Sequence, residues 1–132
     1  MRAAFALIDV MAGMAVLVVI SASVLWALTS SARLAAVSRN YTAAQAVAQK
    51  QIDEVLYANY RPPSNIPAIL TAGATSSAVT ITDGPPAITG KLTTTVSVAD
   101  AALKIRRVSV VVNYDYRGKN HSVAMSTARA PD

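Results

Sequence analysis

The sequence predicts an α+β protein in which a long N-terminal α-helix packs on a small antiparallel β-sheet head. Three observations support this fold class. From Phe5 to Leu28, 20 of 24 residues are apolar, an apolar stripe with helical spacing follows, and the C-terminal third alternates between apolar and polar residues. A stripe that recurs every three or four residues indicates a helix, and alternation with a period of two indicates strands.

The composition excludes several classes of function. The chain of 132 residues has no cysteine and one histidine, His121. A disulfide framework and a thiolate metal site are therefore excluded. A Ser-His-Asp hydrolase is disfavoured, because His121 is the one histidine that could act as its base. We interpret His121, beside a turn, as a solvated loop residue and expect no cofactor, no metal and no enzymatic activity. The net charge of +5 is spread along the chain and is only a weak sign of anionic partners.

The segment Val10–Leu28 is a run of 19 residues without a charge. At roughly 1.5 Å per residue, a helix of this length just crosses the hydrocarbon layer of a membrane. The alternative is a secretory signal peptide, with Arg2 as its basic start and the small residues 21–23 as its cleavage site. Asp9 at the front of the run, and the lack of a helix breaker behind it, favour a membrane helix.

The helix is expected to continue beyond the apolar run, to about Tyr60. No proline occurs before Pro62, and Gly13 is the only glycine in this part of the chain. A continued helical period places one apolar stripe on the second half of the helix. We expect this stripe to lie under the sheet, and its members are Leu34, Val37, Tyr41, Ala44, Ala48, Ile52 and Val55.

Asp9 is the main candidate for a functional residue. An aspartate in the middle of a membrane helix costs on the order of 2.5 to 3.5 kcal/mol on insertion scales, and less near an end. One interpretation is that Asp9 is solvated at headgroup depth or stabilises the first turn of the helix as an acidic residue. The other is that it pairs with a cation from another copy of the chain, because carboxylates within membranes usually have a partner.

The remainder of the chain predicts the sheet. Prolines and glycines between Arg61 and Gly90 indicate a loop with one strand at Ala78–Thr82. Beyond it, Arg117–Asn120 is a good turn and predicts an antiparallel hairpin. The alternating segments that we expect to form strands are Leu92–Val98, Val108–Asp115 and Val123–Thr127.

The N-terminal segment Phe5–Met11, behind a short leader that contains arginine, resembles the N-terminal signature of type IV pilins and type II secretion pseudopilins. That signature reads Gly, Phe, Thr, Leu, Ile, Glu. The segment Ala46–Leu56 followed by Tyr60, and the last strands with Ser122–Thr127, resemble the same parts of minor pilins and small pseudopilins. The resemblance covers nearly the whole helix and the final thirty residues.

The resemblance implies three roles near the N-terminus. A prepilin peptidase would cut between Ala4 and Phe5, and the new amine of Phe5 would be methylated. Asp9 would take the place of the family's glutamate and pair with the N-terminal amine of a neighbouring subunit during assembly. Two departures from the pattern matter, because Ala4 stands where glycine is usual and Asp9 is one methylene shorter than glutamate.

The expected organisation has five segments in a single pilin-like fold. They are a leader peptide (1–4), the membrane and filament-core half of the helix (5–28), its amphipathic half (29–60), a variable loop (61–90) and the sheet head (91–132).

The expected function is that of a structural subunit, a pilin or pseudopilin and in the first place a minor pilin, and not an enzyme. It would be held in the inner membrane, cut by a prepilin peptidase, and assembled with other pilin subunits by an assembly platform into a filament at the cell surface. A major pilin, and a signal-anchored periplasmic binding module, are the alternatives. DNA could contact Lys104, Arg106 and Arg107, but no aromatic residues accompany them to stack bases.

Overall fold

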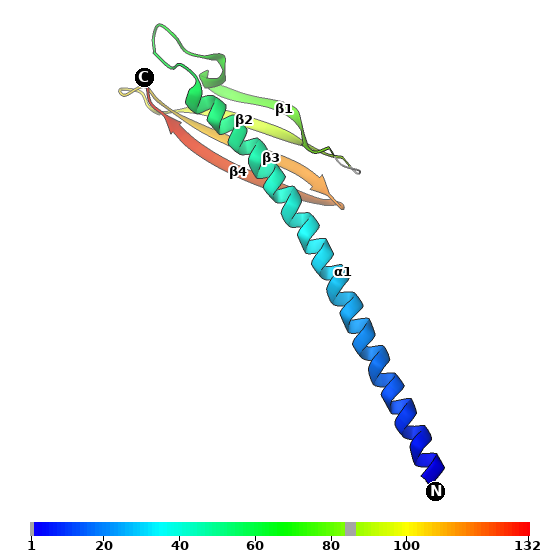
Figure 1. Cartoon of the computed structure of the whole chain (residues 1–132). Helices are drawn as coiled ribbons and strands as arrows, with labels where there is room; N and C mark the ends of the chain where they lie inside the picture. Colours follow the sequence, from blue (N-terminus) through cyan, green and yellow to red (C-terminus); the bar gives the residue numbers. More distant parts are fainter. Residues whose placement is uncertain (1, 84–86) are drawn as a thin grey trace. The chain divides into compact units, whose positions relative to one another are not determined.

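The structure is a computed structural model that describes residues 2–83 and 87–132, with side chains from Asp9 onward. It confirms the predicted α+β fold of one long N-terminal helix and an antiparallel sheet (Figure 1). The chain forms two compact units, one up to Ser38 and one from Arg39 to Asp132. The elements are α1 (Arg2–Tyr57), the 3-10 helix η1 (Ala68–Leu70), β1 (Gly73–Thr82), β2 (Ile88–Asp100), β3 (Ile105–Tyr116) and β4 (Lys119–Arg129).

The four strands form an antiparallel sheet in the order β1-β2-β3-β4, so each strand pairs with its neighbour in sequence. The predicted hairpin is present between β3 and β4, where Tyr116 pairs with Lys119. The two residues between them, Arg117 and Gly118, both have positive φ, at 53° and 72°. A two-residue loop with this backbone matches the twist of the strands that it joins.

β1 is longer than the sequence predicts. A strand was expected only at Ala78–Thr82, within a loop over residues 61–90, but the strand begins at Gly73 and β2 already begins at Ile88. Residues 73–78 are all exposed, and β1 is an edge strand. Their backbone is ordered by pairing with β2, from Gly73 opposite Val96 onward, and not by a buried face. Alternation therefore could not reveal the first half of this strand.

The core lies between the second part of α1 and the sheet. The helix contributes two alanines, Ala44 and Ala48, followed by Ile52 and Val55. Small side chains allow the helix axis to approach the sheet closely. The sheet contributes alternate residues of β3, which is paired on both sides. The members with no exposed area are Ala44, Ala48, Val55, Leu70, Val108, Val110 and Val112.

The observed stripe differs from the expected one at its N-terminal side. Ile52 and Val55 are buried as expected, but Leu34 (71% exposed), Val37 (36%) and Tyr41 (48%) are not. Helical periodicity identifies which residues share a face. It does not identify what covers that face, or where along the helix the cover begins.

A substitution of Leu70 tests whether residues 61–90, which were expected to form a variable loop, contribute to the core. Replacing this fully buried leucine by alanine leaves a cavity, so we expect Leu70→Ala to lower the free energy of unfolding by about 2 to 5 kcal/mol. Leu103→Ala is the matched control, because Leu103 is 63% exposed and its truncation should change stability by about 0.5 kcal/mol or less. Urea unfolding of the full chain in detergent measures both. Equal effects would contradict the burial assigned to Leu70.

Candidate functional site

The apolar run of α1 is exposed along its whole described length. Its large side chains, including Leu17 at 68% and Trp26 at 73%, are more than half exposed. By length and composition, the helix from Asp9 onward is long and apolar enough to cross a membrane, and no part of its most apolar window is buried. An apolar surface of this extent marks a site that lipid or protein covers.

The hydroxyl groups of the run find acceptors within the helix itself. Ser21 Oγ donates to the Leu17 carbonyl at 2.8 Å, and Ser23 Oγ donates to the Val19 carbonyl at 2.8 Å. Since an unsatisfied polar group is costly in an apolar environment, such internal bonds suit a helix that lies among hydrocarbon or other apolar helices. The surface of the run therefore presents no unpaired hydroxyl at these positions.

Asp9 is exposed at the N-terminal end of this surface. Within residues 9–83 and 87–132, no cation lies close enough to form an ion pair with it. The predicted cleavage and methylation residues, Ala4 and Phe5, lie outside the residues whose side chains the structure describes. The relation of Asp9 to an N-terminal amine of another copy therefore stays a prediction.

A clamp at the end of the head, formed by Arg129 and Asp132, holds the segment that follows α1. The Tyr60 N–H donates to Asp132 Oδ2 at 2.8 Å, and the Asp132 N–H donates to the Tyr60 carbonyl at 2.9 Å. Arg129 donates to the Ala58 carbonyl at 3.1 Å and pairs with the Asp132 carboxylate. A cation on the last carbonyls of a helix satisfies acceptors that have no partner within the helix.

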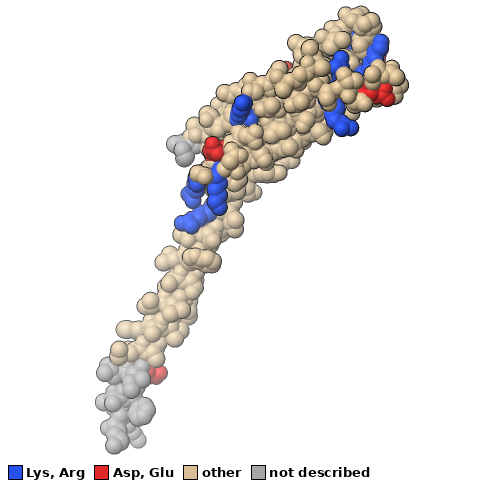
Figure 2. Space-filling view, turned by 180° about the vertical axis from the view of Figure 1, so that it is seen from behind, with Lys and Arg blue, Asp and Glu red and all other residues tan. Residues whose placement is uncertain are grey.

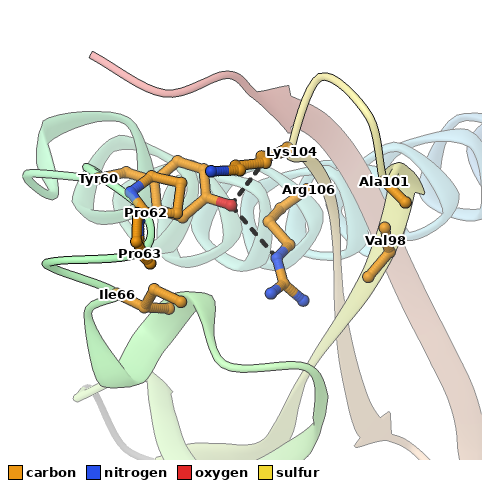
Figure 3. Close-up of a pocket in the computed structure, with 8 residues that line it drawn as sticks. All are labelled: Tyr60, Pro62, Pro63, Ile66, Val98, Ala101, Lys104 and Arg106. Atoms are coloured by element: carbon orange, nitrogen blue, oxygen red, sulfur yellow. Dashed lines mark hydrogen bonds between the residues drawn. The ribbon is translucent and has the colours of Figure 1, made fainter.

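A cavity of about 260 Å³ opens beside this clamp (Figure 3). The Tyr60 hydroxyl donates to the Lys104 carbonyl at 2.7 Å and accepts a longer bond of 3.4 Å from Arg106 Nε. Arg106 is half-buried, and its guanidinium points into the space between residues 61–66 and the end of β2. The cavity is lined by Tyr60, Pro62, Pro63, Ile66, Val98, Ala101, Lys104 and Arg106.

Tyr114 and His121 form a second polar feature, at the other end of β3. Tyr114 is buried, and its hydroxyl has no hydrogen-bond partner in the part of the chain that the structure describes. Burial, and to a smaller extent the nearby Tyr41, raise the pKa of the Tyr114 phenol above 10.0. His121 is not the solvated loop residue that was expected. It lies in β4, is half-buried and stacks on Tyr114, with ring centroids 5.3 Å apart.

The fold separates Arg107 from the other two cations considered for DNA, Lys104 and Arg106. Lys104 and Arg106 line the cavity, whereas Arg107 is exposed on the next position of β3. On the face shown in Figure 2, Lys and Arg lie in separate groups and not in one continuous stripe. Among the described residues, no group of three His, Asp or Glu side chains could hold a metal ion.

The cavity and the clamp were not found by sequence analysis. Tyr60 is 44 residues from Lys104, 46 from Arg106 and 72 from Asp132. Residues so far apart in the sequence share no local pattern that could predict their contact. Comparison of the chain with models of known protein families, with curated proteins and with solved structures found no match.

Asp132 makes the clamp sensitive to acid. The hydrogen bond from Arg129, and then that from the Tyr60 N–H, hold the pKa of the Asp132 carboxyl below its usual 3.8. A carboxyl with a lowered pKa in the folded state stabilises the fold above its unfolded pKa, and this contribution is lost as pH falls through the folded pKa. We therefore expect wild type to melt at a higher temperature than Asp132→Asn at neutral pH.

This difference in melting temperature should shrink as pH falls below about 3.8. Thermal unfolding followed by circular dichroism across pH 2 to 7 measures it. Asp115→Asn is the control, because the Asp115 carboxylate accepts a bond from the Asn120 side chain and not from an arginine. A difference that is constant over this range would show that the clamp does not act through the ionised carboxylate.

Proposed function

We propose that this chain is a structural subunit of the pilin or pseudopilin type, held in the inner membrane and then assembled through its N-terminal helix into a filament at the cell surface. The observation that carries the proposal is the exposed, uncharged surface of Val10–Leu28 with a carboxylate, Asp9, at its front. The sheet head and the resemblance of residues 5–11 to the family's signature support it.

Burial of apolar surface alone does not favour a filament over the membrane. Lipid chains and the surface of a neighbouring helix are similarly apolar, so helices in this environment associate by close packing and by polar contacts. Gly13 has open space where a Cβ would stand, and Ala12 and Ala15 lie within two residues of it, so the backbone can be approached closely here. This stretch of small residues supplies a packing contribution near Asp9.

Asp9 supplies the polar contribution and sets the axial register between subunits. After cleavage between Ala4 and Phe5, the chain would begin with an amine four residues before Asp9. If two helices are offset along their axes so that Asp9 does not meet this amine, its carboxylate stays buried without a partner, which costs free energy. A buried polar residue fixes the register of a coiled coil in the same way. The pairing thus selects one arrangement among many that are equally apolar.

A minor subunit agrees best with the resemblance of the helix end and the last strands, and a major pilin is the alternative. Abundance separates them, since a major subunit dominates the material sheared from cells. The cavity at Arg106 favours a second candidate, a signal-anchored periplasmic binding module whose helix is only a tether. Mass spectrometry of the native N-terminus separates these classes, because a subunit begins at a methylated Phe5 and a tether retains Met1.

Replacing Asp9 tests the assembly role. We expect Asp9→Ala to insert in the membrane and to fold its head, but to reduce the yield of filaments that contain the chain more than tenfold. Losing one member of a buried ion pair costs about 3 to 5 kcal/mol at each contact. Quantitative immunoblots of sheared filaments and of membranes measure assembly and insertion separately.

Asp9→Glu is the matched control, because it keeps the carboxylate and restores the side-chain length that is usual in the family. It should retain filament yield, whereas Asp9→Asn, which keeps the shape but not the charge, should behave like Asp9→Ala. Filaments of normal yield from Asp9→Ala would rule out a role for this residue in register.

A further inference from the structure

The cavity at the end of the head combines the guanidinium of Arg106 with apolar walls and with the end of β2, whose residues 97–100 extend beyond the start of β1. We propose that it binds the C-terminal end of an extended peptide whose last residue is apolar, with the terminal carboxylate held by Arg106. This inference concerns the head alone and does not depend on whether the chain assembles into filaments.

Arg106 is oriented for an anion. Its Nε donates to the Tyr60 hydroxyl, which is itself fixed by its bond to the Lys104 carbonyl. No acceptor for the two terminal nitrogens lies among the residues that the structure describes, and in Figure 3 they point into the cavity. A guanidinium presents two parallel N–H groups, which match the two oxygens of a carboxylate.

The walls of the cavity select an apolar group next to that carboxylate. Pro62, Pro63 and Ile66 lie on one side and Val98 and Ala101 on the other (Figure 3). Ile66 and Val98 are 42% and 51% exposed, so a ligand would remove apolar surface from water. A phosphate or a sugar would leave these walls uncovered, and about 260 Å³ holds one side chain and its carboxylate rather than a large molecule.

The end of β2 favours a peptide over a free acid. The described ladder between β1 and β2 begins at Gly73 opposite Val96, whereas β2 stays paired with β3 as far as Asp100. The edge of residues 97–100 therefore continues beyond the start of β1. An extended chain can add to such an edge through main-chain hydrogen bonds while its side chains enter a pocket. Val98 belongs to this edge and also lines the cavity.

The charges around the cavity suit an anionic ligand. Arg106 and Lys104 line it, and Arg61 precedes its proline wall. The two nearby carboxylates already have partners, because Asp132 pairs with Arg129 and Asp100 accepts a bond from the Leu103 N–H. Within the described part of the chain, neither Lys104 nor Arg106 pairs with a carboxylate, which favours a carboxylate over a neutral chain end.

The test uses the full chain in nanodiscs and the acetylated pentapeptide Thr-Val-Thr-Ala-Leu with a free C-terminal carboxylate, titrated by NMR or calorimetry. We expect saturable binding that weakens at least tenfold when the peptide is amidated. Arg106→Gln should weaken binding at least tenfold, and Tyr60→Phe should weaken it less. Arg107→Gln, one position along the same strand, should change the dissociation constant less than twofold.

Several outcomes would overturn the proposal. These are no saturable binding by the wild-type chain, equal binding of the acid and amide peptides, or equal effects of Arg106→Gln and Arg107→Gln. Binding of N-acetyl-leucine as tight as that of the pentapeptide would assign the cavity to a small acid instead of a peptide end. Circular dichroism and the melting temperature of Arg106→Gln establish that it folds. If it does not, the comparison of acid with amide peptide on the wild-type chain decides.

Discussion

The structure depends first on the fact that the surface of Val10–Leu28 cannot remain in water. Its side chains are large, apolar and more than half exposed, and each square ångström of such surface costs roughly 25 cal/mol in contact with water. The helix is long and apolar enough for a membrane to cover this surface. A membrane satisfies this requirement for a single chain, and a bundle of identical helices satisfies it for an assembly. The proposed passage from one to the other needs no change in the helix itself, because its hydroxyls are already paired internally.

The head keeps its shape with a small core and no disulfide. It does so by packing Ala44, Ala48, Ile52 and Val55 on the central strands, and by fastening the chain after α1 to Arg129 and Asp132. The same fastening holds Tyr60, which positions Arg106. The stability of the head and the orientation of Arg106 thus depend on one group of contacts.

Much of the fold could be predicted from the sequence because it follows from local patterns. The long helix follows from the apolar run, the stripe and the absence of proline, and the strands from Leu92 to Thr127 follow from alternation. The first half of β1 could not be predicted, because Gly73–Ser77 has no buried face and is held by its pairing with β2. Leu34, Val37 and Tyr41 belong to the right helical face, but periodicity could not show where the cover of that face begins. Of the candidate sites, Asp9 could be predicted because it is a charged residue at the front of an apolar run. The contacts among Tyr60, Arg106 and Asp132 could not, because these residues are far apart in the sequence and come together only in the folded chain.

The central claim is that neighbouring helices cover the run Val10–Leu28 in the assembled state. Because the chain has no cysteine, single cysteines introduced one by one along this run report on it without ambiguity. The account predicts that oxidation of sheared surface filaments cross-links pairs of chains at positions that recur every three to four residues, and that chains diluted in membranes do not cross-link. Filaments that contain the chain without a cross-link at any position of the run would contradict it.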